Sequence, residues 1–238
     1  MSLKFSCFIT GTDTGVGKTL VTAAFLYALD RAGLPATGVK PVAAGTVLVN
    51  GEAFNDDVAM LADASGTSLP SEMTTPYLLR EAAAPHIAAA LEGVSIDAGH
   101  LLRCYQQVAV LTEAVVVEGV GGFRVPLSEQ FDTADLAAQL GLDMILVVGL
   151  RLGCINHALL TAEAIAARGL RLAGWVANQI DVAMPYQEEN VQALRDRLAA
   201  PLIGVVPWMT SPTAAAAAHY LDFSLLPSWP GTAKKADA

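Results

Sequence analysis

A glycine-rich segment near the start of the chain carries the clearest chemistry. Gly11 to Thr19 reads Gly-Thr-Asp-Thr-Gly-Val-Gly-Lys-Thr, and it lies between an apolar run and a helical pattern, the context of a phosphate-binding loop. Backbone N–H groups of such a loop bind phosphate oxygens together with the helix N-terminus. Lys18 would contact the β- and γ-phosphates of ATP, and the Thr19 hydroxyl would bind Mg²⁺. Five residues, not the standard four, separate Gly11 from Gly17. A glycine-rich turn with a surface lysine is nevertheless the weaker interpretation.

Further polar residues stand where other apolar runs end. Lys40 comes at the end of one run, Asn178 follows another, and Glu118 closes the run Ala-Val-Val-Val-Glu, with glycines after it. A carboxylate directly after four apolar residues is costly to bury unless it is paired or bound to a metal. We therefore expect Glu118 to belong to a functional site.

The elements that position these residues are strands alternating with helices. Continuous apolar strands of this kind predict a mostly parallel sheet with helices on both faces, an α/β fold of the P-loop NTPase type. Ligands of such sheets bind at the carboxyl ends of the strands, so the residues above should converge on one edge. The predicted strands are Phe5–Thr10, Thr37–Lys40, Ala114–Glu118, Met144–Val148, Leu172–Ala177 and Leu202–Val206, and the clearest helices are Thr19–Ala32, His157–Arg168 and Tyr186–Ala199.

Length and composition narrow the class of protein. The 238 residues suit one domain, which we expect over residues 1–227, followed by a disordered polar tail over 228–238. A net charge of −9 argues against nucleic-acid binding. We find neither an apolar stretch that could cross a membrane nor a signal peptide, so we expect a cytoplasmic protein. The three widely spaced cysteines predict neither a zinc site nor a disulfide framework.

Together, these segments resemble the dethiobiotin synthetase family from Ile9 to about Leu226. The stretch Cys-Ile-Asn-His is not expected in a general P-loop ATPase. The resemblance implies an ATP-dependent ligase of biotin biosynthesis. CO₂ and 7,8-diaminopelargonate would form a carbamate, ATP would phosphorylate it, and the neighbouring amine would close the ureido ring. The most specific segments are Gly11–Thr19, Lys40–Val42, Glu118–Gly122, Leu152–Ala158, Gly174–Asn178 and Pro207–Trp208.

The resemblance also implies the catalytic and metal-binding residues. Lys18 and Lys40 would neutralise charge on the carbamate and the transferred phosphoryl group, the main catalytic task in such a reaction. Thr19, Asp57 and Glu118 would bind Mg²⁺ through oxygen atoms. Asp56 competes with Asp57 for this role, although the Val-Ala-Met-Leu that follows favours Asp57. Either aspartate could instead be a helix N-cap.

The nucleotide site implied by the resemblance extends to the last strands. Asn178 would hydrogen-bond to adenine, since an amide both donates and accepts. Trp208 would line the base pocket, or it could equally be a core aromatic residue. The implied nucleotide-binding residues are Gly15, Val16, Gly17, Lys18, Thr19, Leu20, Asp57, Glu118, Gly119, Val120, Gly121, Asn178, Gln179, Pro207, Trp208 and Met209.

The substrate site implied by the resemblance is shared between two subunits of a homodimer. A loop at a helix start would bind the substrate carboxylate through its amides, and in the family this loop comes from the partner subunit. Cys154 and His157 have no partner for thiol or acid–base chemistry, and we interpret both as structural. The implied substrate-binding residues are Ala44, Gly153, Cys154, Ile155 and Asn156.

Several positions depart from the family pattern. They are Gly15, Ala44, Gln179 and the run Ala214–Ala218, and they concern nucleotide selectivity and substrate affinity instead of the reaction itself. The alternative function is a regulatory P-loop ATPase of the partition or metal-insertion type. Such proteins usually carry a second lysine inside the phosphate loop, whereas Lys18 is the only lysine in this one.

Overall fold

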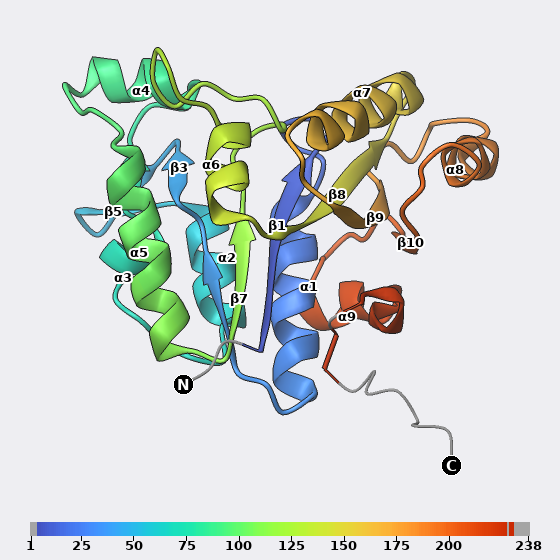
Figure 1. The fold of residues 1–238 in the computed structure, drawn as a ribbon, viewed down its shortest axis with the longest axis horizontal. Helices are drawn as coiled ribbons and strands as arrows, with labels where there is room; N and C mark the ends of the chain where they lie inside the picture. The colour runs from blue at the N-terminus through green and yellow to red at the C-terminus, as the bar shows by residue number, and fades with distance from the viewer. Residues whose placement is uncertain (1–3, 228, 231–238) are drawn as a thin grey trace.

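The computed structural model describes residues 4–227 and 229–230. Its centre is a six-stranded sheet in the order β10-β9-β8-β1-β7-β2, in which every neighbouring pair is parallel (Figure 1). The prediction of a mostly parallel P-loop NTPase-type sheet is therefore confirmed. The strands are β1 (Phe5–Gly11), β2 (Ala36–Val39), β7 (Ala114–Glu118), β8 (Asp143–Leu150), β9 (Leu172–Gln179) and β10 (Leu202–Val206).

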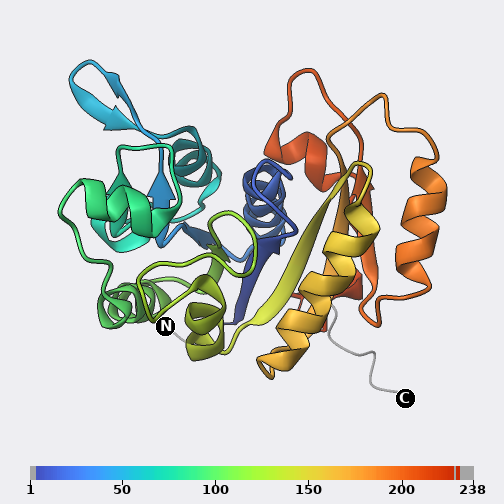
Figure 2. The same ribbon diagram turned by 90° about the horizontal axis from the view of Figure 1, so that it is seen from above.

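Helices cover both faces of this sheet because each buries an apolar side against it. Figure 2 shows α1 (Lys18–Arg31), α2 (Asp56–Ala64) and α9 (Ala214–Ala218) on one face, where they share a core with β1. The opposite face carries α5 (Ala98–Leu111), α6 (Thr133–Leu140), α7 (Cys154–Ala167) and α8 (Gln187–Arg195). The sheet thus lies between two helical layers.

A smaller group of elements follows β2. Strands β3 and β6 pair in parallel, and β4 and β5 form an antiparallel hairpin that projects from the body of the protein (Figure 2). The sequence patterns did not predict these short strands. The group consists of β3 (Val42–Ala44), β4 (Val47–Val49), β5 (Glu52–Phe54), α3 (Ser71–Thr74), β6 (Tyr77–Leu79) and α4 (Pro85–Leu91), and a 3₁₀ turn, η1 (Phe223–Leu225), follows α9.

Some element ends differ from the predicted ones. Helix α7 begins at Cys154 instead of His157, so the Cys-Ile-Asn-His segment forms its first turn. Helix α8 ends at Arg195, four residues before the predicted end at Ala199. In the predicted tail, the ring of Trp229 stacks on Phe223 with centroids 4.3 Å apart, while residues 228 and 231–238 lie outside the described residues. Among the described helices, none is both long and apolar enough to cross a bilayer.

Candidate active site

The phosphate loop connects β1 to α1 and has the backbone shape that its glycines permit. Gly15 and Gly17 adopt φ values of +72° and +88°, and Gly17 is the N-cap of α1. A Cβ atom at Gly17 would lie only 2.1 Å from Nδ2 of Asn178. The positive φ and this close approach together require glycine here. The loop therefore presents backbone N–H groups and a helix N-terminus at one place, an arrangement that binds anions.

Lys18 is the buried cation of this loop. Its side chain is almost fully enclosed, and Nζ donates a hydrogen bond to the Asp13 carbonyl oxygen at 2.9 Å. Burial lowers the pKa of Lys18 to about 8, although Glu118, Asp57 and Asp13 partly oppose this effect. An anion bound in the loop would offset the cost of burying the ammonium group.

Lys40 lies between two carboxylates beside the loop. Its Nζ donates to Oδ2 of Asp57 at 2.5 Å and to Oε1 of Glu118 at 2.6 Å. Burial lowers the pKa of Lys40, but the charges of Glu118 and Asp57 outweigh burial, so the net direction is upward. Glu118 is fully buried and paired, as its position after four apolar residues led us to expect.

The structure distinguishes Asp57 from its neighbour Asp56. Oδ1 of Asp57 accepts a hydrogen bond from the Thr19 hydroxyl at 2.8 Å, whereas Asp56 is exposed. Neither aspartate caps the helix, because Asn55 is the N-cap of α2 and accepts from the backbone amide of Val58. Asp57 is therefore the aspartate that faces the phosphate loop.

The oxygen atoms around Thr19 fit a divalent cation. The Thr19 hydroxyl lies 2.8 Å from Asp57 and 2.9 Å from Glu118, but its single hydrogen serves only one of them. Oε2 of Glu118 is buried and has no hydrogen-bond partner among the described residues. A hydroxyl and two carboxylates, one with an unpaired buried oxygen, form a donor set that Mg²⁺ prefers.

A cavity of about 860 Å³ opens in front of these residues. Many predicted site residues line it together: Gly15, Gly17, Lys18, Thr19, Lys40, Ala44, Asp57, Glu118, Val120 and Gly121. The cavity also has an apolar wall over Ala82–Pro85 and a third cation, Arg124, which the sequence patterns did not identify. The same cavity is therefore lined by the phosphate-binding loop, by the oxygen atoms that suit a metal ion and by an apolar surface.

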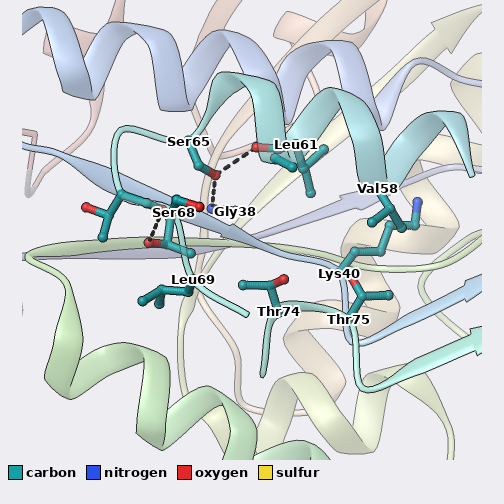
Figure 3. Close-up of a pocket in the computed structure, with 12 residues that line it drawn as sticks. Gly38, Lys40, Val58, Leu61, Ser65, Ser68, Leu69, Thr74 and Thr75 are labelled. Atoms are coloured by element: carbon teal, nitrogen blue, oxygen red, sulfur yellow. Dashed lines mark hydrogen bonds between the residues drawn. The ribbon is translucent and has the colours of Figure 1, made fainter. Parts of the chain in front are cut away.

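A second cavity of about 40 Å³ lies behind Lys40, between α2 and β2 (Figure 3). Ser65 lines it, and the Ser65 hydroxyl donates to the Leu61 carbonyl oxygen and accepts from the Gly38 amide. The Thr37 hydroxyl donates to the Thr67 carbonyl oxygen, both of which belong to lining residues, and the volume suits one or two water molecules. Figure 3 shows the nitrogen of Lys40 beside Val58, at the far end from Ser68.

The predicted adenine-binding residues lie behind the phosphate loop and do not line the large cavity. Asn178 is buried at the end of β9, and its Nδ2 donates to the Val16 carbonyl oxygen at 2.9 Å. Gln179 accepts from the backbone amide of Trp208 at 3.3 Å. Trp208 is 50% exposed, which excludes the core alternative for its ring. Val16, Leu20, Gly119, Pro207 and Met209 also lie outside the cavity lining.

Comparisons with known proteins show the family of this chain. The family model described as an AAA domain matches residues 6–216. The ATP-dependent dethiobiotin synthetase BioD of Janthinobacterium sp. (strain Marseille) is 59% identical over 234 residues, which cover 97% of this chain and 99% of the relative. The chain belongs to the dethiobiotin synthetase family. The match spans the phosphate loop and every other segment of the site.

Solved structures support the fold of this dethiobiotin synthetase family member. A ParA family ATPase from Chlorobium tepidum TLS matches with a TM-score of 0.55 and 14% identity, covering 87% of this chain and 86% of the other. A MinC:MinD cell division protein complex from Aquifex aeolicus matches with a TM-score of 0.54 and 16% identity, covering 86% and 82%. At these identities the likeness shows the fold alone.

The segment that would bind substrate in a dethiobiotin synthetase lies outside the large cavity of this chain. Gly153, with φ of +95°, is the N-cap of α7, and Asn156 is exposed in the first turn. Cys154 is buried in the core under α7 and α8, which agrees with a structural role. None of Gly153 to Asn156 lines the cavity of this chain.

An ion pair that the sequence patterns missed connects the end of β8 to the phosphate loop. The Arg151 guanidinium, just after β8, donates to the carboxylate of Asp13. The backbone amide of Thr14 lowers the pKa of Asp13 most, and Arg151 lowers it further. The two residues are 138 positions apart in the chain, and no local spacing could have indicated that they meet.

Proposed function

We propose that the protein is an ATP-dependent dethiobiotin synthetase that converts 7,8-diaminopelargonate, CO₂ and ATP into dethiobiotin, ADP and phosphate. The observation that carries this proposal is the 59% identity to a dethiobiotin synthetase along 97% of the chain. The cavity supports it, because cations and a phosphate loop surround a space with an apolar wall. Such a site suits phosphoryl transfer to a substrate with an aliphatic chain.

In this proposal the protein acts mainly by positioning and by neutralising charge. The phosphate loop and Lys18 hold the β- and γ-phosphates of ATP. A carbamate oxygen attacks the γ-phosphate in line, and Lys40 stabilises the charge that develops on the transferred group. The second amine then attacks the carbamate carbon, so that the ureido ring closes and phosphate leaves.

We propose that Thr19, Asp57 and Glu118 hold Mg²⁺ when nucleotide binds. Two observations support this assignment: Oε2 of Glu118 has no hydrogen-bond partner among the described residues, and the Thr19 hydroxyl lies within hydrogen-bonding distance of both carboxylates. The bound ion would neutralise phosphate charge. Because Lys40 now pairs with Asp57 and Glu118, it would have to share or exchange these partners in the loaded site.

We propose that Asn178, Gln179, Pro207, Trp208 and Met209 form the adenine site. The half-exposed ring of Trp208 supports a contact with a base. The Nδ2 atom of Asn178 already bonds to the Val16 carbonyl oxygen. Its second N–H and its Oδ1 atom would serve the base, so one side chain would connect the base site to the phosphate loop.

We further propose a cytoplasmic homodimer in which Gly153 to Asn156 of one subunit complete the site of the other. Leu152 is 92% exposed beside this segment and Leu160 is 56% exposed further along α7, which supports burial of this face in a dimer. Lys18→Ala and Asn156→Ala variants should each be nearly inactive. Refolded together, they should recover roughly a quarter of the parent activity, because half of the dimers are mixed and each mixed dimer has one intact site. Absence of recovery, with heterodimers verified by mass spectrometry, would contradict the shared site.

The function itself is tested by the products. Purified protein should release one ADP per dethiobiotin, and only when the diamino acid, bicarbonate, ATP and Mg²⁺ are all present. Omission of each component in turn is the control. ADP release that continues at the same rate without the diamino acid would instead favour a regulatory ATPase.

A further inference from the structure

Arg124 is the third cationic side chain that lines the large cavity, after Lys18 and Lys40. It comes two residues after the glycine-rich segment Glu118–Gly122. Lys18 is enclosed by the phosphate loop, and Lys40 is paired with two carboxylates. Arg124 remains 58% exposed, so it is the cation that meets the open part of the cavity.

The position of Arg124 is fixed from both sides. The Thr133 hydroxyl donates to the Phe123 carbonyl oxygen at 2.5 Å and accepts from the Val125 amide at 3.0 Å, so it holds the residues before and after Arg124. Nε of Arg124 donates to Oδ2 of Asp132 at 2.5 Å. Asp132 is itself held as the N-cap of α6, where its Oδ1 accepts from the Asp135 amide.

This arrangement leaves one edge of the guanidinium available. The bond to Asp132 uses only Nε, and the structure records no hydrogen bond from the two terminal nitrogens among the described residues. The edge that remains offers paired N–H donors in a plane. That geometry matches the two oxygens of a carboxylate.

The location of Arg124 indicates which end of a ligand it would meet. Thr19 belongs to α1 and Asp57 to α2, on one face of the sheet, whereas Asp132 caps α6 on the opposite face (Figure 2). Small apolar residues also line the cavity, namely Ala82 to Pro85, Val120 and Val125. An elongated ligand with an alkyl chain would thus place its reacting end at the lysines and its other end at Arg124.

We propose that Arg124 binds the carboxylate of the diamino acid substrate, an inference that rests on the proposed function. The chain has a net charge of −9, so the carboxylate end of the substrate needs a local cation to hold it. The proposed partner-subunit loop at Gly153 to Asn156 supplies amides but no full charge. Because a carboxylate accepts about four hydrogen bonds, both groups can serve it together.

The test compares two substrates that differ only in the carboxylate. For 7,8-diaminopelargonate, Arg124→Gln should lower kcat/KM at least about tenfold, mainly through KM, because a charge-assisted contact is lost. For 2,3-diaminooctane, which has the same diamine and chain but no carboxylate, the same variant should match the parent within about twofold. Arg124→Lys keeps the charge without the paired N–H donors, so its kcat/KM for the diamino acid should lie between the values of the parent and of Arg124→Gln. ADP affinity, measured by calorimetry, should stay unchanged in both variants.

Arg103→Gln is the matched control, since Arg103 is a similarly exposed arginine that pairs with Asp97 away from the cavity. Equal losses on both substrates, or no loss on the diamino acid, would overturn the proposal. If Arg124→Gln unfolds, the ratio of kcat/KM for the diamino acid to kcat/KM for 2,3-diaminooctane is compared between Arg124→Lys and the parent. A ratio that does not fall in Arg124→Lys would then overturn the proposal. Failure of the proposed function would appear differently, as absence of dethiobiotin with the parent protein. Calorimetric binding of the diamino acid to the parent and to Arg124→Lys would then still test Arg124.

Discussion

The buried lysine of the phosphate loop should make nucleotide affinity depend on pH. Burial lowers the pKa of Lys18 to about 8 in the free protein. Bound phosphates favour the charged form and should return the pKa to the ordinary range of about 10 or above. Below pH 8, Lys18 is already charged and binding needs no proton. Above pH 8, binding must be accompanied by uptake of a proton, so affinity should fall as pH rises.

The size of the effect follows from the two pKa values. Between pH 7 and pH 9, the charged fraction of a lysine with a pKa of about 8 falls from about 0.9 to about 0.1. The Kd for ADP should therefore rise about tenfold over this range, or about 1.4 kcal/mol. Lys40 should not contribute, because Glu118 and Asp57 raise its pKa despite burial and keep it charged throughout.

Titration calorimetry with ADP and EDTA, at pH 7 and pH 9, measures this directly. Two buffers with different ionisation enthalpies should report uptake of nearly one proton at pH 9 and almost none at pH 7. Lys18→Arg is the control, because arginine remains charged at both pH values and should abolish the slope. A constant Kd between pH 7 and pH 9, with no proton uptake, would refute the proposed role of burial at Lys18.

Three substitutions test other parts of the site. Lys40→Ala should lower kcat by about 100-fold or more, because its proposed contacts form in the transition state. Its affinity for metal-free ADP, measured by calorimetry, should stay within about threefold of the parent. A loss of ADP affinity as large as that of Lys18→Ala would contradict this. Glu118→Gln should raise the Mg²⁺ concentration for half-maximal activity by about tenfold or more, and an unchanged Mg²⁺ titration would return Glu118 to a structural role. Gly17→Ala should lower both Tm and ADP affinity, since its Cβ would collide with Asn178. Gly141→Ala, at a positive φ with open space around it, should lower Tm alone, and equal effects of both variants on ADP affinity would argue against the collision.

The sheet and the centre of the site could be predicted because both depend on local patterns. Apolar runs identify strands, and parallel strands end at one edge, so Lys18, Lys40 and Glu118 were expected to converge. The observed contacts of Lys40 with Glu118 agree with that reasoning. Only the structure could separate Asp57 from Asp56, because the choice depends on which of them faces Thr19 after Asn55 has capped α2.

Other features depend on contacts between distant segments and had no sequence signal. Arg124 comes after a glycine loop and looks like an ordinary surface residue until Asp132 and Thr133 are seen to fix it. The pairing of Arg151 with Asp13 is of the same kind. The hairpin β4–β5 consists of two strands of three residues with mostly exposed side chains, too short and too exposed for an alternating pattern to be recognised.

The fate of the carbon atom from bicarbonate tests the central claim most directly. Purified protein with diamino acid, ATP, Mg²⁺ and ¹³C-labelled bicarbonate should give dethiobiotin that mass spectrometry finds heavier by a single mass unit, with the label at the ureido carbon. ADP should accumulate in equal amount. Turnover of ATP without labelled dethiobiotin would contradict the proposed function.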